Sequence, residues 1–118
     1  MRTFMTLSSM AIILAVAISC VGRQYQLDAH NLTSFEISEA RVVFDNGKGF
    51  EWGVMDPDVE KGMYPMIGPL TEQAVVEWTD HEGGEHSCRV QVPLGRSVNS
   101  LKFIIRQDGT VKVEGSHE

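Results

Sequence analysis

The chain is poor in cysteine and proline and has no cluster of positive charge. Its 118 residues include two cysteines and four prolines, and 10 Lys and Arg residues stand against 16 Asp and Glu, for a net charge of −6. Nucleic-acid binding depends largely on neutralising phosphates with Lys and Arg. The composition therefore argues against a nucleic-acid partner.

Familiar catalytic motifs are also missing. The sequence contains no Gly-x-Ser-x-Gly nucleophile elbow and no phosphate-binding Gly-Lys-Ser/Thr loop. Asp28 and His30 lie two residues apart and would share a strand face, but no third residue fixes the geometry of a triad. A pair of acids for glycoside hydrolysis stays open, because the separation of carboxylates is not readable from sequence. We expect a non-enzymatic protein without a cofactor.

The first 20 residues are organised like a secretory signal. Arg2 is followed by an uncharged stretch, whose apolar core covers 10–18 and ends in small residues. A membrane-spanning helix needs about 20 apolar residues, so the short core favours a cleaved signal. An uncleaved anchor remains a second interpretation, since no charge occurs between Thr3 and Gly22.

The segment Ala17-Ile18-Ser19-Cys20 resembles the lipobox of bacterial lipoprotein precursors. Ile18, Ser19 and Cys20 fit that pattern, whereas Ala17 stands where Leu, Val or Ile is more usual. The resemblance implies a signal peptide over 1–19, a diacylglycerol on the Cys20 thiol and a short tether over 20–24. It also implies an envelope location, at the outer membrane if the cell is Gram-negative. Acyl chains buried in a bilayer contribute about 0.8 kcal/mol per CH₂, so two or three chains anchor stably.

An ordinary secretory signal, cut after Ala17 or Ser19, is the alternative. It would make the protein periplasmic or secreted, and would allow a bridge between Cys20 and Cys88. If Cys20 carries lipid, Cys88 has no partner within the chain, and we interpret it as a small buried residue on a strand.

Residues 25–118 have the hydrophobic pattern of one all-β domain. Apolar residues alternate with polar ones at 25–29, 50–54, 74–79, 88–92, 100–106 and 111–113, and 41–44 is a β-branched run. Turn residues separate these segments at intervals typical of sandwiches and barrels, and the polar residues of 31–34 predict one of these turns. We predict a small antiparallel, immunoglobulin-like β-sandwich of six or seven strands, with Trp52 and Trp78 in its core.

The segment 59–70 breaks this pattern. It contains two glycines and two prolines among apolar residues, which excludes a regular helix or a central strand. We predict an irregular loop that closes the core. A partner contact through Met63, Tyr64, Met66 and Ile67 is the alternative, because Met and Tyr are common at adaptable binding surfaces.

His81, His86 and Cys88 are the only candidates for a metal site. Imidazole and thiolate are zinc and copper ligands, but the spacing fits no established zinc pattern. Gly83-Gly84 instead indicates a solvated turn flanked by polar residues, which is the interpretation that we favour. Asp56, Asp58 and Glu60 likewise lack the pattern of a calcium-binding loop.

These observations favour a membrane-anchored envelope lipoprotein that acts as a binding or structural module, with an envelope protein as its partner. The second hypothesis is an inhibitor or immunity-type protein that blocks a periplasmic or extracellular hydrolase. Its basis is the acidity of a small exported domain, which suits a basic target.

Overall fold

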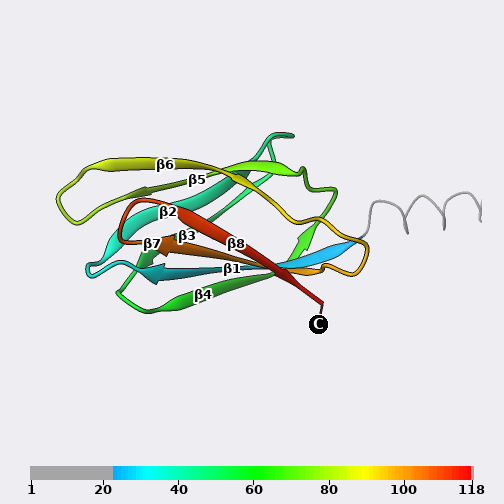
Figure 1. Ribbon diagram of the computed structural model, residues 1–118, viewed down its shortest axis with the longest axis horizontal. Helices are drawn as coiled ribbons and strands as arrows, with labels where there is room; N and C mark the ends of the chain where they lie inside the picture. The colour runs from blue at the N-terminus through cyan, green and yellow to red at the C-terminus, as the bar shows by residue number, and fades with distance from the viewer. Residues whose placement is uncertain (1–22, 118) are drawn as a thin grey trace, which may run out of the picture.

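Eight β-strands run through residues 23–117, which are the residues that the computed structural model describes, apart from the side chains of Met63 and Tyr64. Figure 1 shows them in two layers. The strands are β1 (Gln24–Leu32), β2 (Ile37–Phe44), β3 (Gly49–Met55), β4 (Glu60–Ile67), β5 (Gln73–Thr79), β6 (Glu85–Gln91), β7 (Ser100–Arg106) and β8 (Val111–Ser116).

The strands form two four-stranded sheets, in the orders β4-β1-β7-β8 and β3-β2-β5-β6. Every pairing is antiparallel except that of β1 with β7. The predicted all-β sandwich is confirmed. Its connectivity differs from that of a constant-type immunoglobulin domain, in which the first two strands share a sheet, because β1 and β2 here lie in opposite sheets.

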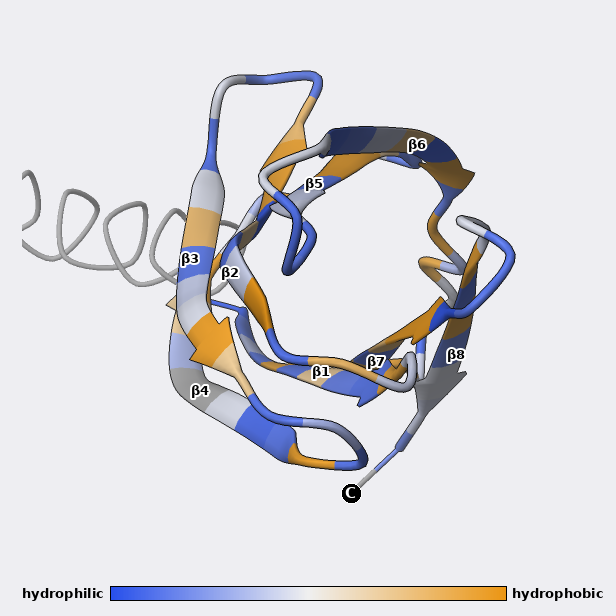
Figure 2. Cartoon of the chain, turned by 90° about the vertical axis from the view of Figure 1, so that its left-hand side faces the viewer, coloured by the Kyte–Doolittle hydropathy of each residue, from blue (hydrophilic) through white to orange (hydrophobic). Residues whose placement is uncertain are grey.

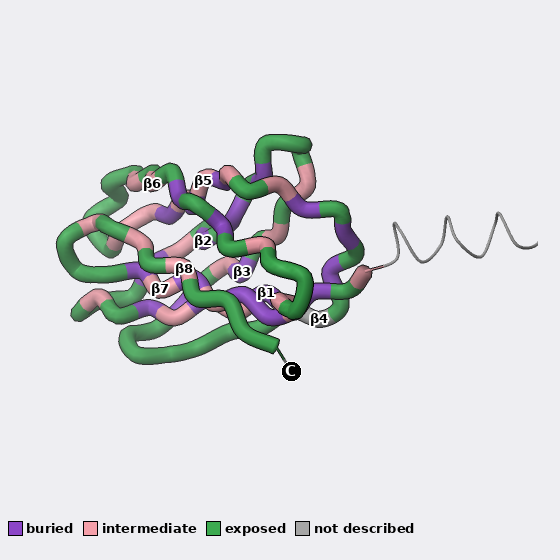
Figure 3. The backbone as a smooth tube through the Cα atoms, turned by 45° about the vertical axis from the view of Figure 1, so that its right-hand side comes forward, coloured by how far each residue is buried: buried purple, intermediate pink, exposed green. Residues whose placement is uncertain are grey.

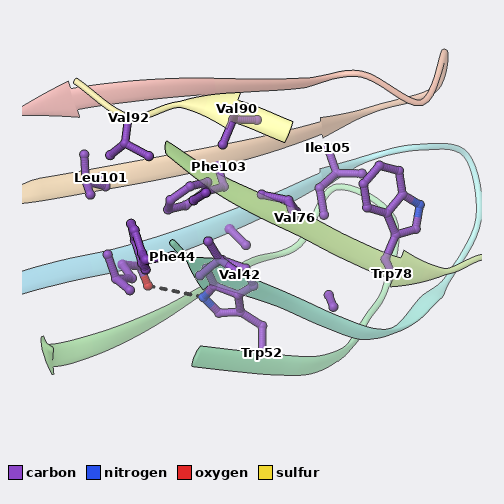
Figure 4. Close-up of a cluster of buried hydrophobic side chains, with 14 of the residues drawn as sticks. Val42, Phe44, Trp52, Val76, Trp78, Val90, Val92, Leu101, Phe103 and Ile105 are labelled. Carbon is purple, nitrogen blue, oxygen red and sulfur yellow. Dashed lines mark hydrogen bonds between the residues drawn. The ribbon is translucent and has the colours of Figure 1, made fainter. Parts of the chain in front are cut away.

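The core lies between the two sheets, and buried residues alternate with less buried ones along most strands (Figure 3). Leu27, Val42, Val76 and Phe103 are fully buried at its centre. Trp52 and Trp78 are 6% and 4% exposed, so their predicted core positions are confirmed. Figure 4 shows both indoles among the aliphatic side chains of the facing sheets.

The predicted loop at 59–70 is wrong over most of its length, because residues 60–67 form the edge strand β4. Pro65 is tolerated there for two reasons. Edge strands and bulges are the places in a sheet that accept proline, and β4 has both properties: Tyr25 pairs with Met66 while Leu27 pairs with Met63, so the register shifts around Pro65. This strand raises the count above the predicted six or seven.

Two predicted boundaries also move. Gln24, expected in the tether, is the first residue of β1. Asn31, expected in a turn, continues β1 because its backbone still pairs with β7 opposite Ile105. Long-range pairing thus extends β1 at both ends.

Candidate binding site at the distal end of the sandwich

The direction of the strands sorts the loops into two groups. β1, β3, β5 and β7 run away from the end where Arg23 enters, and β2, β4, β6 and β8 return to it. The loops 33–36, 56–59, 80–84 and 107–110 therefore gather at the opposite end, on the left of Figure 1. We call this the distal end; Figure 2 looks onto it.

Asn31 holds two of these loops together. Its side chain is fully buried, and its Nδ2 donates to the carbonyls of Phe35 and Met55, both at 3.0 Å. Its Oδ1 accepts from the Thr33 backbone N–H at 3.0 Å and from the Thr33 hydroxyl at 2.6 Å. Its backbone N–H donates to the Val59 carbonyl at 3.1 Å. The loops 33–36 and 56–59 thus take their positions from one residue.

His86 and Asp80 form the best-defined polar pair of the distal end. His86 Nε2 lies 2.7 Å from Asp80 Oδ2, and the imidazole stacks on the Trp78 indole with 5.2 Å between ring centroids. Asp80 Oδ1 also accepts from the backbone N–H groups of Glu82 and Gly84. The His86 hydrogen bond, followed by that of Gly84, lowers the pKa of Asp80 to about 2. The His86–Asp80 pair and the turn 80–84 therefore hold each other in position.

A second pair of stacked rings lies near the Trp78–His86 stack. The Phe35 and His81 rings stack with centroids 3.9 Å apart, although Phe35 remains half exposed. Both residues border a hollow of about 290 Å³, whose lining also includes Trp78, Asp80 and His86. The hollow is therefore framed by aromatic rings, carboxylates and the Arg106 side chain, a combination suited to binding polar groups.

His30 lies on the outer face of the sheet β4-β1-β7-β8, close to the distal end. Its Nε2 lies 2.8 Å from Asp58 Oδ1, and its Nδ1 lies 3.2 Å from Glu60 Oε1. Glu60 in turn accepts from Lys102 Nζ at 2.9 Å. That hydrogen bond lowers the pKa of Glu60 and raises the pKa of Lys102. Asp28 points elsewhere, toward the Gln26 amide, so it does not form the pair with His30 that a triad would need.

The metal-site candidates are not brought together. His81 stacks on Phe35, His86 pairs with Asp80, and Cys88 is a free, half-buried thiol packed against the core. Among the described residues, no group of three or more His, Cys, Asp or Glu side chains is arranged to hold a metal ion. The solvated turn that we favoured is present, since residues 80–84 connect β5 and β6 in a hairpin.

The predicted partner-contact residues lie on β4, and the two whose side chains are described differ in exposure. Met66 is buried in the core, so its side chain is not available to a partner in this conformation. Ile67 is half exposed at the end of β4 that pairs with Gln24. The side chains of Met63 and Tyr64 lie outside the described residues.

Cys20 and the predicted signal peptide also lie outside the described residues. Between residues 23 and 117, no helix is long and apolar enough to cross a membrane.

Sequence reasoning missed Asn31 and Phe35, which the structure places at the centre of the distal end. Phe35 was visible as an apolar residue next to a polar turn. Asn31 was visible as part of a predicted turn and of an Asn-Leu-Thr glycosylation sequon, and its complete burial argues against modification of the folded protein. Its hydrogen bonds join segments about 25 residues apart, which no local pattern predicts.

The fold defines a small eight-stranded β-sandwich with its candidate site on the loops of one end. No protein-family model matches the chain, and no curated protein matches it. Among solved structures, the chain is similar to the NMR structure of a protein from Eubacterium rectale, with a TM-score of 0.62 and 14% identity. The similarity covers 81% of this chain and 91% of that one. At this identity it shows the fold alone.

Proposed function

We propose that this protein is a lipid-anchored, non-enzymatic binding module of the bacterial cell envelope. The lipobox-like segment Ala17-Ile18-Ser19-Cys20 supports the anchor. The observation that carries the proposal is the position of Arg23. It enters the sandwich at the end opposite the four distal loops, only three residues after the cysteine.

Arg23 is firmly attached to the domain. Its Nη2 donates to three carbonyls of the loop 92–99, those of Gly95, Arg96 and Val98. A lipid on Cys20 would therefore keep the Arg23 end of the sandwich close to the membrane. Nine residues of β1 span about 30 Å, so the distal end would face away from the lipid surface at about that distance.

A binding role agrees with how the polar groups of the distal end are used. His30 and His86 each pair with carboxylates, and Asp80 closes its own turn. These contacts position loops at the end of a rigid sandwich, which is where binding residues are commonly placed.

The test is the intact mass of the mature protein from the membrane fraction of its own host. A species that begins at Cys20 and carries diacylglycerol is the expected result. Cys20→Ser should move the protein to the soluble fraction, whereas Cys88→Ser, the matched control, should leave it in the membrane. An unlipidated soluble protein would remove the anchor from the proposal.

The second candidate function is inhibition of a periplasmic or extracellular hydrolase. One observation favours it: the four distal loops carry six carboxylates and no Lys or Arg, which suits a basic enzyme. Expression beside candidate lytic enzymes should then protect cells from lysis. Unchanged lysis with every enzyme tried would count against it.

A further inference from the structure

We propose that the distal end docks onto a basic protein surface, through four exposed apolar side chains and the carboxylates of its loops. This inference rests on the proposed binding function and names the chemistry of the partner. It combines two independent observations, an exposed apolar patch and a one-sided distribution of charge.

The apolar patch is concentrated at one end of the molecule. Six large hydrophobic side chains are exposed among the described residues, and four of them lie at the distal end. Their exposed fractions are 46% for Leu32, 50% for Phe35, 49% for Val54 and 36% for Val59. Clustered apolar exposure marks interaction sites more often than scattered exposure does.

The four side chains belong to backbone segments that Asn31 joins. Leu32 follows it in β1, and the Val59 and Phe35 carbonyls accept its hydrogen bonds. Val54 precedes Met55, whose carbonyl is the third acceptor. The patch is thus carried on a fixed framework, so a partner would not have to order these loops on binding.

The charge is distributed unequally between the two ends. The distal loops contain six acidic residues and no Lys or Arg: Glu36, Asp56, Asp58, Asp80, Glu82 and Asp108. The loops at the other end, 45–48, 68–72 and 92–99, contain two acidic and two basic residues, and Arg23 adds another positive charge there. Arg106, the last residue of β7, is a cation outside these loops that lines the hollow. The distal end is therefore the acidic pole of the molecule.

This charge decides between possible occupants of the patch. A second copy of the chain, docked through its own distal end, would place six carboxylates against six others, and an anionic lipid surface would be repelled in the same way. A basic protein surface has the complementary potential, which raises the association rate and selects the partner. The exposed apolar side chains would then supply the burial that holds the complex together.

The experiment uses a photo-crosslinking amino acid introduced into the full chain in its native host. Positions 35 and 59 probe the patch. Positions 43 and 67 are the matched controls, because Val43 and Ile67 are also exposed hydrophobic residues, at 37% and 51%, but lie near the Arg23 end. The proposal predicts a protein adduct from positions 35 and 59 and none from 43 and 67.

The crosslinked protein is then purified and titrated against mature protein by calorimetry. We expect the affinity to fall at least about tenfold between roughly 50 and 300 mM salt. Glu36→Lys with Asp56→Lys should weaken binding by a similar factor. Glu72→Lys with Glu51→Lys, a control pair of exposed acids outside the distal loops, should change it less than about twofold.

Four results would overturn the proposal: no adduct, equal adducts from all four positions, adducts only to a second copy or to lipid, or an affinity that neither salt nor the distal substitutions change. Failure of the anchor is a separate outcome. It is detected by the intact mass, and it does not alter the pattern expected from positions 35 and 59.

Discussion

The Trp52 indole links the two sheets by a hydrogen bond through the core. Trp52 Nε1, on β3, donates to the carbonyl oxygen of Leu27, on β1, over 3.3 Å (Figure 4). Phe50 and Phe103 pack around the indole at centroid distances of 5.8 and 5.6 Å. Most contacts between the sheets are apolar and tolerate sliding, whereas this one is directional, so it helps to fix how the sheets face each other.

Trp52→Phe should destabilise the sandwich by about 2 kcal/mol, combining a lost hydrogen bond and a small cavity. Trp78→Phe is the matched control, since it removes the same volume from another buried indole, one that packs on His86. The measurement is the free energy of unfolding in urea. Equal losses for the two variants would mean that the bond to Leu27 contributes little.

Asn31→Ala should cost about 2–4 kcal/mol, because it removes the Nδ2 donor from the buried carbonyl of Met55 and from that of Phe35, which keeps the Thr33 hydroxyl as a donor. The control is Asn46→Ala. Asn46 makes a similar side-chain bond, to the Pro69 carbonyl, but on an exposed loop, and its loss should cost less than about 1 kcal/mol. Hydrogen exchange should also rise in the loops 33–36 and 56–59. A variant as stable as wild type would contradict the role assigned to Asn31.

Asp80 should make the free energy of unfolding depend on pH within a defined acidic range. Its pKa in the folded protein is lowered to about 2 from 3.8, so its contribution to the free energy of unfolding is complete above about pH 4. That contribution is lost as the pH falls from 3.8 toward 2. The gap in stability between wild type and Asp80→Asn should therefore be constant near neutral pH and close across this window.

Urea unfolding at a series of pH values measures that gap. Asp56→Asn, at an exposed carboxylate in a neighbouring distal loop, serves as the control. A gap for Asp80→Asn that stays constant down to pH 2 would argue against the pair with His86.

At position 39, the shape of the substituted side chain should affect the free energy of unfolding more than its charge does. Glu39 has a φ of +52° at a bulge in β2, where the register shifts between Ile37 and Ala40. A left-handed conformation costs an L-residue about 1–2 kcal/mol, and asparagine tolerates it better than β-branched residues do. Glu39→Val should thus lose about 1–2 kcal/mol relative to Glu39→Asn.

Glu51→Val tests this interpretation on the neighbouring strand. Glu51 is exposed on β3 and lies opposite Arg41 in the strand register. Valine is favoured in strands. That substitution should change the free energy of unfolding by less than about 0.5 kcal/mol. Similar effects of valine at both positions would exclude backbone conformation as the cause.

The candidate site was only partly predictable from sequence. The run 80–86 stood out because imidazoles and carboxylates are dense there, and the structure confirms a turn at 80–84, with 85 and 86 already in β6. Sequence could not show that His86 would stack on Trp78 or that His81 would meet Phe35, since the latter contact joins loops more than 40 residues apart. Met66 was assigned to a loop because Pro65 hid the edge strand β4, which buries its side chain.

The sequence by itself determined the sandwich class and most of its strands. Alternation with a period of two is local, and it placed the β5–β6 hairpin and β7 within a few residues. Only the tertiary structure decided the sheet order, the edge strand β4 and the role of Asn31. Each depends on pairing between distant segments: β1 lies between β4 and β7, and this arrangement buries Asn31 beside two loops. Buried backbone groups need hydrogen-bond partners. In this fold those partners come from segments distant in sequence, so the local sequence does not predict them.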